Sequence, residues 1–308
     1  MCMRRYVLRR LLQFVPVLLG ATFLIYAMMW ALPGDPLAGR CGDRACPQSY
    51  VDRMTEAYNL SDPLVVQYVK YMAGVFTGDL GTTFAGVPVA DELLSRLPLT
   101  AQLAGLAIVF EIILGVTAGV LAALRPGGLL DSAILVSTLI VVAIPMFVLA
   151  LLGQSFFGVE LGWFPVTSDG SLLSLILPAV VLGSVSVAVV ARVMRSSMIA
   201  SLQADHVRTA QAKGLAPRRV VVAHGVRNSL IPVTTLVGAD LGVLLGGTVV
   251  VEMIFNINGI GDLLLRSVGD GEIGTVTATV TMLVLAFLII NLVVDLLYPL
   301  LDPRIRHE

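Results

Sequence analysis

Long apolar blocks constrain this chain more than any other feature of its sequence. An α-helix rises 1.5 Å per residue, so about 20 apolar residues cross the roughly 30 Å hydrocarbon core of a bilayer. Charged residues make up only 13% of the 308 positions, against about 25% in soluble domains, and the mean hydropathy is +0.91. The pattern therefore predicts an all-α membrane protein with six transmembrane helices. The predicted spans are Leu11–Leu32, Leu99–Leu124, Ala133–Leu152, Leu172–Val193, Ile231–Val251 and Thr275–Leu301.

Arginines and lysines predict the orientation of these spans. Four arginines precede the first block, as in a signal peptide, but its apolar stretch exceeds the usual limit of about 15 residues and no A-x-A site follows. We therefore expect a retained signal-anchor helix. With the N-terminus inside, 14 of the 20 Lys and Arg residues fall in inside segments, which predicts an N-in, C-in topology. The predicted organisation is an N-terminal basic segment and first span (1–32), a long extracytoplasmic loop (33–98) and a five-helix core (99–308).

The extracytoplasmic loop over 33–98 has a layout of its own. Mixed polar and apolar runs predict short helices, and the amphipathic spacing of Asp91–Leu97 predicts a segment lying along the membrane interface. Cys41 and Cys46 form a C-x4-C pair that would face an oxidising space. The pair is a candidate disulfide, and two unpaired thiols in a loop are the alternative.

Enzyme motifs are missing from the sequence. It contains no G-x-x-x-x-G-K-[ST] loop for ATP, no H-E-x-x-H and no G-x-S-x-G. The three histidines are too widely spread for a metal site, and no strongly basic domain suggests nucleic-acid binding. We therefore expect no catalytic residues, no bound metal and no nucleic-acid partner.

Carboxylates inside predicted spans are candidates for a transport pathway. Glu111 and Asp240 lie near mid-span and Asp295 lies nearer the cytoplasmic end. A buried carboxylate needs a partner or water, so each either lines a cavity or makes a helix–helix hydrogen bond. Small residues and a proline permit close helix packing or a local break beside a pathway. The candidate pathway-lining residues are Asp240, Gly246, Gly247, Glu111 and Pro145.

The cytoplasmic loop over 195–230 is the most unusual segment. Residues Ala204–Lys213 read as a helix, and Gly214 suits the left-handed residue that follows a helix end. After Pro217, a second helix is expected over Arg218–Arg227, with Pro232 opening the fifth span. A short basic helix below the membrane suits either contact with a protein partner or contact with anionic lipid.

Motifs in this loop resemble those of a known family. The segments His206-Val-Arg-Thr-Ala-Gln-Ala-Lys-Gly-Leu215 and His224-Gly-Val-Arg-Asn-Ser-Leu-Ile-Pro232 resemble the coupling loop of ABC importer permeases, most closely the B-type permease of dipeptide and oligopeptide importers. Other stretches agree collinearly over nearly the whole chain. They include Leu32-Pro-Gly-Asp-Pro36, Gly78-Asp-Leu-Gly81, Leu94-Ser-Arg-Leu-Pro-Leu-Thr100, Gly246-Gly-Thr-Val-Val-Val-Glu252, Gly259-Ile-Gly261 and Leu301-Asp-Pro-Arg304.

The resemblance implies a type I ABC importer permease fold in the cytoplasmic membrane of a prokaryote. It also implies a second permease subunit, two ATPase subunits that bind ATP and Mg²⁺, and an extracytoplasmic binding protein. The implied substrates are di- and oligopeptides, with haem, nickel or glycosides as alternatives, and an ion-coupled secondary transporter is the competing class. The implied ATPase-contacting residues are Arg208, Thr209, Ala210, Gln211, Ala212, Lys213, Gly214 and Leu215.

Two departures from the family pattern stand out. Arg208 occupies the place where the general coupling motif has glutamate, so no specific salt bridge carries over. The stretch Phe255-Asn-Ile-Asn-Gly259 lacks the expected aromatic–proline pair, which leaves the details of that outside segment open.

Overall fold

The computed structural model describes residues 3–30 and 47–301. Cys41 and Cys46 lie outside these ranges, so their pairing remains a prediction. The described residues form helices joined by turns, with one isolated β-bridge between Thr82 and Pro88. In chain order the elements are α1 (Met3–Trp30), α2 (Gln48–Ala57), α3 (Leu64–Thr77), α4 (Val89–Leu124), α5 (Leu129–Ala143), α6 (Met146–Gly153), the π-helix η1 (Gln154–Glu160), α7 (Leu172–Gln203), α8 (Asp205–Ala212), α9 (Pro217–Arg219), the π-helix η2 (Val220–Val226), α10 (Arg227–Ile254), α11 (Ile260–Gly269) and α12 (Ile273–Leu301).

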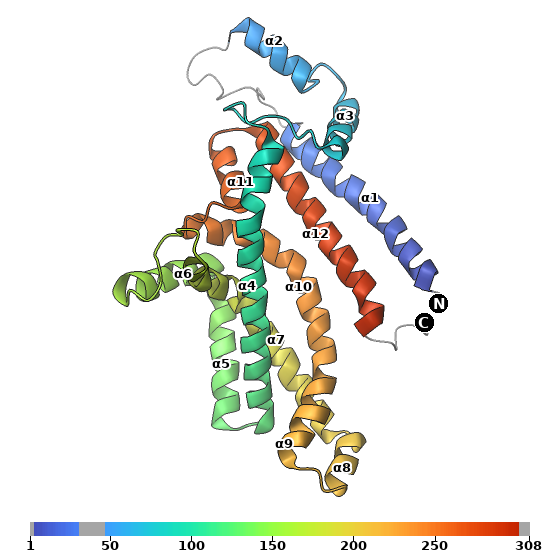
Figure 1. Cartoon of the computed structure of the whole chain (residues 1–308), viewed down its shortest axis with the longest axis vertical. Helices are drawn as coiled ribbons and strands as arrows, with labels where there is room; N and C mark the ends of the chain where they lie inside the picture. Colours follow the sequence, from blue (N-terminus) through green and yellow to red (C-terminus); the bar gives the residue numbers. More distant parts are fainter. Residues whose placement is uncertain (1–2, 31–46, 302–308) are drawn as a thin grey trace.

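The spans fit an all-α membrane protein. Five helical segments among the described residues are long and apolar enough to cross a bilayer, and α5 with α6–η1 adds a sixth if that bent pair is one span. The long helices carry α8 and α9 at one end and α2, α3 and α11 at the other (Figure 1). The distribution of Lys and Arg assigns the α8 end to the cytoplasm. The expected short helices of the extracytoplasmic loop are α2 and α3.

The third predicted span is not one straight helix. It breaks at Ile144-Pro145, and the two arms, Leu129–Ala143 and Met146–Glu160, are bent by 105°. Proline has no amide hydrogen to donate and disfavours helical backbone in the residue before it, so Ile144 is extended (φ −92°, ψ 128°). Of the two alternatives that the proline left open, close packing or a local break, the structure has the break, and the predicted span over Ala133–Leu152 runs across both arms.

The second and fifth predicted spans start too late. Residues 91–97 form no separate interfacial helix, because they are part of the first turns of the 36-residue helix α4. Likewise the segment after Pro217 is continuous with the fifth span, over Pro217–Ile254, and Pro232 lies inside α10 instead of opening it. In both regions the helix extends beyond the apolar stretch, because neighbouring elements pack against the polar extension.

The core is built on the close packing of α4 against α7. Gly115 and Gly119 of α4 lie so near Val190 and Met194 of α7 that a Cβ on either glycine would overlap those side chains. Gly183 of α7 approaches the backbone of α4 equally closely, with a Cβ position 2.8 Å from the Ala107 carbonyl oxygen. Small residues at such a seam let two membrane helices maximise van der Waals contact. The packing at this seam fixes the position of α4 relative to α7, and these two helices extend toward both ends of the molecule.

Candidate coupling site and extracytoplasmic cluster

Helix α8 is held against the π-helix η2 by a small apolar cluster. Helix α7 ends at Gln203, Ala204 turns the chain with extended backbone (ψ 152°), and α8 begins at Asp205. Val207 and Ala210 on one face of α8 are buried against Val220 of η2, with Leu215 packed beside them. The predicted helix over Ala204–Lys213 is confirmed, and its apolar face points back toward the molecule.

The opposite face of α8 is open to solvent. Arg208 makes an ion pair with Asp205 at 3.6 Å, but both side chains are largely exposed, 74% and 98%, so the pair contributes little stability. The guanidinium is thus available to a partner. The exposed residues of this face are Arg208, Thr209, Gln211, Ala212, Lys213 and Gly214.

Gly214 ends α8 in the left-handed conformation that its position predicted. Its φ is +75°, its amide donates to the Gln211 carbonyl at 2.9 Å, and the Leu215 amide donates to the Ala210 carbonyl at 3.3 Å. A side chain at Gly214 would meet no atom within 4 Å, so the space beside it is free in this chain. The glycine therefore serves the backbone geometry at the end of α8.

Hydrogen bonds tie the two arms of the loop together. The Ser201 hydroxyl on α7 donates to the His224 carbonyl at 3.2 Å, and the Asn228 amide lies 3.0 Å from the His206 ring nitrogen. Gly225 of η2 packs directly on Met198 of α7. Displacement of α8 would consequently move both α7 and α10.

The candidate pathway residues lie in different surroundings. Glu111 of α4 is completely buried near Asp240 of α10, which is half-buried. Gly246 is exposed with open space beside it, whereas Gly247 packs on Leu182. Pro145 is exposed at the break between α5 and α6. Their role in lining a pathway stays a prediction.

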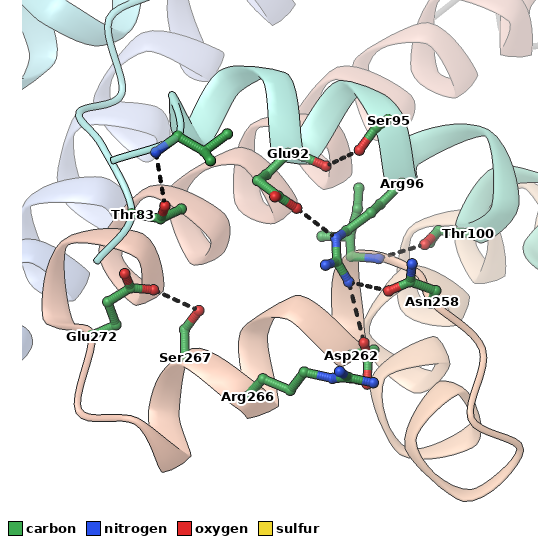
Figure 2. Close-up of polar contacts among 12 residues, drawn as sticks. Thr83, Glu92, Ser95, Arg96, Thr100, Asn258, Asp262, Arg266, Ser267 and Glu272 are labelled. Atoms are coloured by element: carbon green, nitrogen blue, oxygen red, sulfur yellow. Dashed lines mark hydrogen bonds and ion pairs between the residues drawn. The ribbon is translucent and has the colours of Figure 1, made fainter. Parts of the chain in front are cut away.

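A charged cluster joins α4 to α11 at the extracytoplasmic end. The Arg96 guanidinium pairs with Glu92 at 3.0 Å and with Asp262 at 3.2 Å, and it also donates to Asn258. Arg266 pairs with the other oxygen of Asp262 at 2.9 Å. Figure 2 shows these side chains bridging the two helices.

Glu252, at the end of α10, lies directly beneath this cluster and is completely buried. In the sequence Glu252 ends the family motif Gly246-Gly-Thr-Val-Val-Val-Glu252, and no role was predicted for it. A signal was present in the glycines of Gly259-Ile-Gly261, because a Cβ on Gly259 would lie 2.4 Å from the Glu252 carboxylate carbon. Those glycines leave the room that the carboxylate occupies.

Comparison with known proteins identifies the family. Residues 115–307 match the family described as binding-protein-dependent transport system inner membrane component, and residues 3–104 match the corresponding N-terminal family. The chain belongs to this family. It is accordingly a membrane component of an ABC transport system, located in the inner membrane.

Relatives of this permease cover its whole length. The dipeptide transport system permease protein DppB of Alkalihalophilus pseudofirmus is 35% identical, with 99% of this chain and 100% of the relative aligned. The oligopeptide transport system permease protein AppB of Bacillus subtilis is 36% identical with the same coverage. In a solved structure, an inward-facing MetNI methionine ABC transporter, one chain matches with a TM-score of 0.55 at 17% identity, covering 68% of this permease and 96% of that chain. This likeness supports the type I importer permease fold.

Proposed function

We propose that this chain is one of the two permease subunits of an ATP-driven importer of di- and oligopeptides. The observation that carries this proposal is α8, a short helix with a buried apolar face and an exposed basic face, rigidly joined to two membrane-spanning helices. The peptide substrate is supported by the names of full-length relatives, which are dipeptide and oligopeptide permeases. These names do not favour the alternative substrates, haem, nickel and glycosides.

The partners follow from this role. A second, homologous permease would complete the translocation pathway, and two ATPase subunits would bind ATP and Mg²⁺, one of them docking on residues 208–215. An extracytoplasmic binding protein would deliver substrate to the α11 end. The chain itself would catalyse no bond chemistry, since its contribution is a pathway and a mechanical link.

The mechanism we propose is alternating access driven through α8. Closure of the ATPases would draw the coupling helices of the two permeases together. Because α8 packs on η2 and contacts α10 through His206 and Asn228, and Ser201 of α7 donates to His224 of η2, this motion would pass into α7 and α10 and turn the translocation pathway outward. Hydrolysis and release would reverse it. Such coupling between distant sites needs an element with two arrangements that both sites bias.

Replacing Gly214 tests the docking assignment. In the assembled transporter, Gly214→Trp places a bulky side chain on the open side of α8, and we expect ATP-driven uptake and substrate-stimulated ATPase activity to fall about tenfold. The substitution also carries the strain of a left-handed non-glycine residue, about 1–2 kcal/mol. Transport and ATPase assays on proteoliposomes measure the fall in uptake and in ATPase stimulation.

Gly86 provides the matched control. It too has a positive φ, +79°, and open space beside it, but it lies at the opposite end of the molecule. Gly86→Trp should therefore carry the same backbone strain and keep uptake near the parental rate. Undiminished uptake and ATPase stimulation in Gly214→Trp would contradict the coupling role of α8.

A further inference from the structure

Glu252 and Thr100 together accept hydrogen bonds from the free backbone amides at the N-terminus of α11. The Glu252 carboxylate accepts the Gly261 amide at 2.7 Å and the Asp262 amide at 3.1 Å through one oxygen, and the Thr100 hydroxyl at 2.7 Å through the other. Thr100 in turn accepts the Ile260 amide at 2.9 Å. Three successive amides of the first turn are thereby bonded to two buried side chains. We call this pair, Glu252 with Thr100, the clasp.

The clasp joins three separate helices. Thr100 belongs to α4, Glu252 to the last turn of α10, and the bonded amides to α11. Thr100 and Glu252 are 1% and 0% exposed, so no water competes for these bonds. A carboxylate at a helix N-terminus also meets the positive end of the helix dipole, which strengthens the contact. At the surface, Arg96 extends the link by bridging Glu92 of α4 and Asp262 of α11 (Figure 2).

The helix that carries Glu252 also reaches the cytoplasmic end. The helical segment Pro217–Ile254 is unbroken, and at about 1.5 Å per residue it extends roughly 57 Å. Its first turns are the η2 surface on which α8 packs, and its last turn is the clasp. The same helix therefore contacts the candidate ATPase-docking element at one end and α11 at the other.

We propose that Glu252 and Thr100 are positioning residues that make α11 move with α4 and α10. The outer side of α11 and the preceding turn are exposed at Asn256, Asn258 and Arg266, facing the side from which a binding protein would approach. Through the clasp, engagement of that surface would bias α10 and hence α8. This inference rests on the proposed importer function.

The test compares ATPase activity with and without the binding protein in the reconstituted transporter. Thr100→Val removes the hydroxyl at nearly constant volume, and Glu252→Gln removes the charge and one acceptor. For both variants we expect the stimulation by substrate-loaded binding protein to fall about tenfold, while ATPase activity without binding protein stays within about twofold of the parental value. Thr100→Ser keeps the hydroxyl and should restore stimulation.

Controls separate the possible failures. Glu160→Gln removes an exposed carboxylate on the same side of the membrane and should leave stimulation unchanged. Full stimulation in correctly assembled Thr100→Val and Glu252→Gln would overturn the clasp, as would equal loss of activity with and without binding protein. If the parental complex itself shows no stimulation by a binding protein, the importer function fails instead.

Discussion

Asp131 and Arg195 form the best-defined ion pair near the cytoplasmic end. Arg195 of α7 donates to both oxygens of Asp131, Nε at 2.5 Å and Nη2 at 2.7 Å, and the Gly127 amide adds a third bond at 2.8 Å. The Asp131 side chain is 3% exposed. A planar guanidinium bound to both oxygens fixes orientation as well as distance. This pair therefore anchors the turn between α4 and α5 to the part of α7 that leads to α8.

Removing one partner should destabilise the protein measurably. In Asp131→Asn the guanidinium loses its counter-charge in a poorly solvated site, so we expect the unfolding temperature of the purified complex to fall by about 5 °C. Asp62→Asn breaks the exposed pair with Lys70 and should shift it by about 1 °C or less. The single variant Asp131→Asn and the double variant Asp131→Asn/Arg195→Gln lose the same ion pair. The unfolding temperature of the double variant should therefore be only slightly lower than that of Asp131→Asn. Additive losses in a thermal melt would show that the two residues act independently.

At the scale of elements, the break between α5 and α6 distinguishes this chain from a simple bundle of straight spans. Proline explains why the helix can stop at Ile144, but contacts hold the second arm in place. Gln154 of η1 donates to the carbonyls of Val166 at 2.7 Å and Ile254 at 3.1 Å, and Ala150 is buried in the main core cluster. The arm is thus tied to α10 and to the loop that precedes α7.

We expect the bend to survive loss of the proline. In Pro145→Ala, spin labels at the exposed positions Leu130 and Val159 should remain about 26 Å apart, as two arms of about 21 Å at the observed bend require, instead of the roughly 44 Å of a straight helix. Only the double variant Pro145→Ala/Gln154→Leu should populate the longer distance. Pulsed electron spin resonance on a cysteine-free background measures both. A longer distance in Pro145→Ala alone would show that the proline sets the bend by itself.

At the scale of the whole molecule, helices connect the two ends of this permease subunit. Two helical segments, α7 and Pro217–Ile254, join at the α8 end, and the second of them continues to α11 at the other end. A continuous helical path therefore connects the α8 end with the extracytoplasmic end. Among the described residues, only Glu111 and Asp240 are neighbouring carboxylates deep in the spans, and neither forms a salt bridge with a basic residue there. A proton or sodium relay would need more ionisable groups within the spans than these two.

Transport should therefore require the complete assembly. Liposomes containing this chain alone, with an imposed proton or sodium gradient, should take up no labelled dipeptide above the empty-vesicle background. Vesicles with both permeases, both ATPases, the binding protein and ATP should accumulate it, and unlabelled tripeptide should compete whereas nickel and haem should not. Gradient-driven uptake by the lone chain would place it among secondary transporters.

Local chemistry explains what could be predicted from the sequence. Apolar block length identifies a membrane protein because burial of about 20 apolar residues dominates all other preferences. The end of α8 at Gly214 was also predictable, since a left-handed residue after a helix depends on neighbours a few positions away. The resemblance then gave the exposed face of that helix a role that charge and helix-end geometry left open.

Tertiary contacts decided the rest. The hydropathy of a segment does not depend on its direction. The same apolar run can therefore cross the bilayer straight or bend by 105° at Pro145. The amphipathic spacing of residues 91–97 predicts a segment along the membrane interface. In the structure α11 packs beside them and Arg96 pairs with Asp262. Thr100 and Glu252 are 152 positions apart and form their hydrogen bond only where three helices meet. Sequence alone determined which segments are apolar enough to span the membrane and where α8 ends, while the packing of those segments decided which buried polar groups find partners.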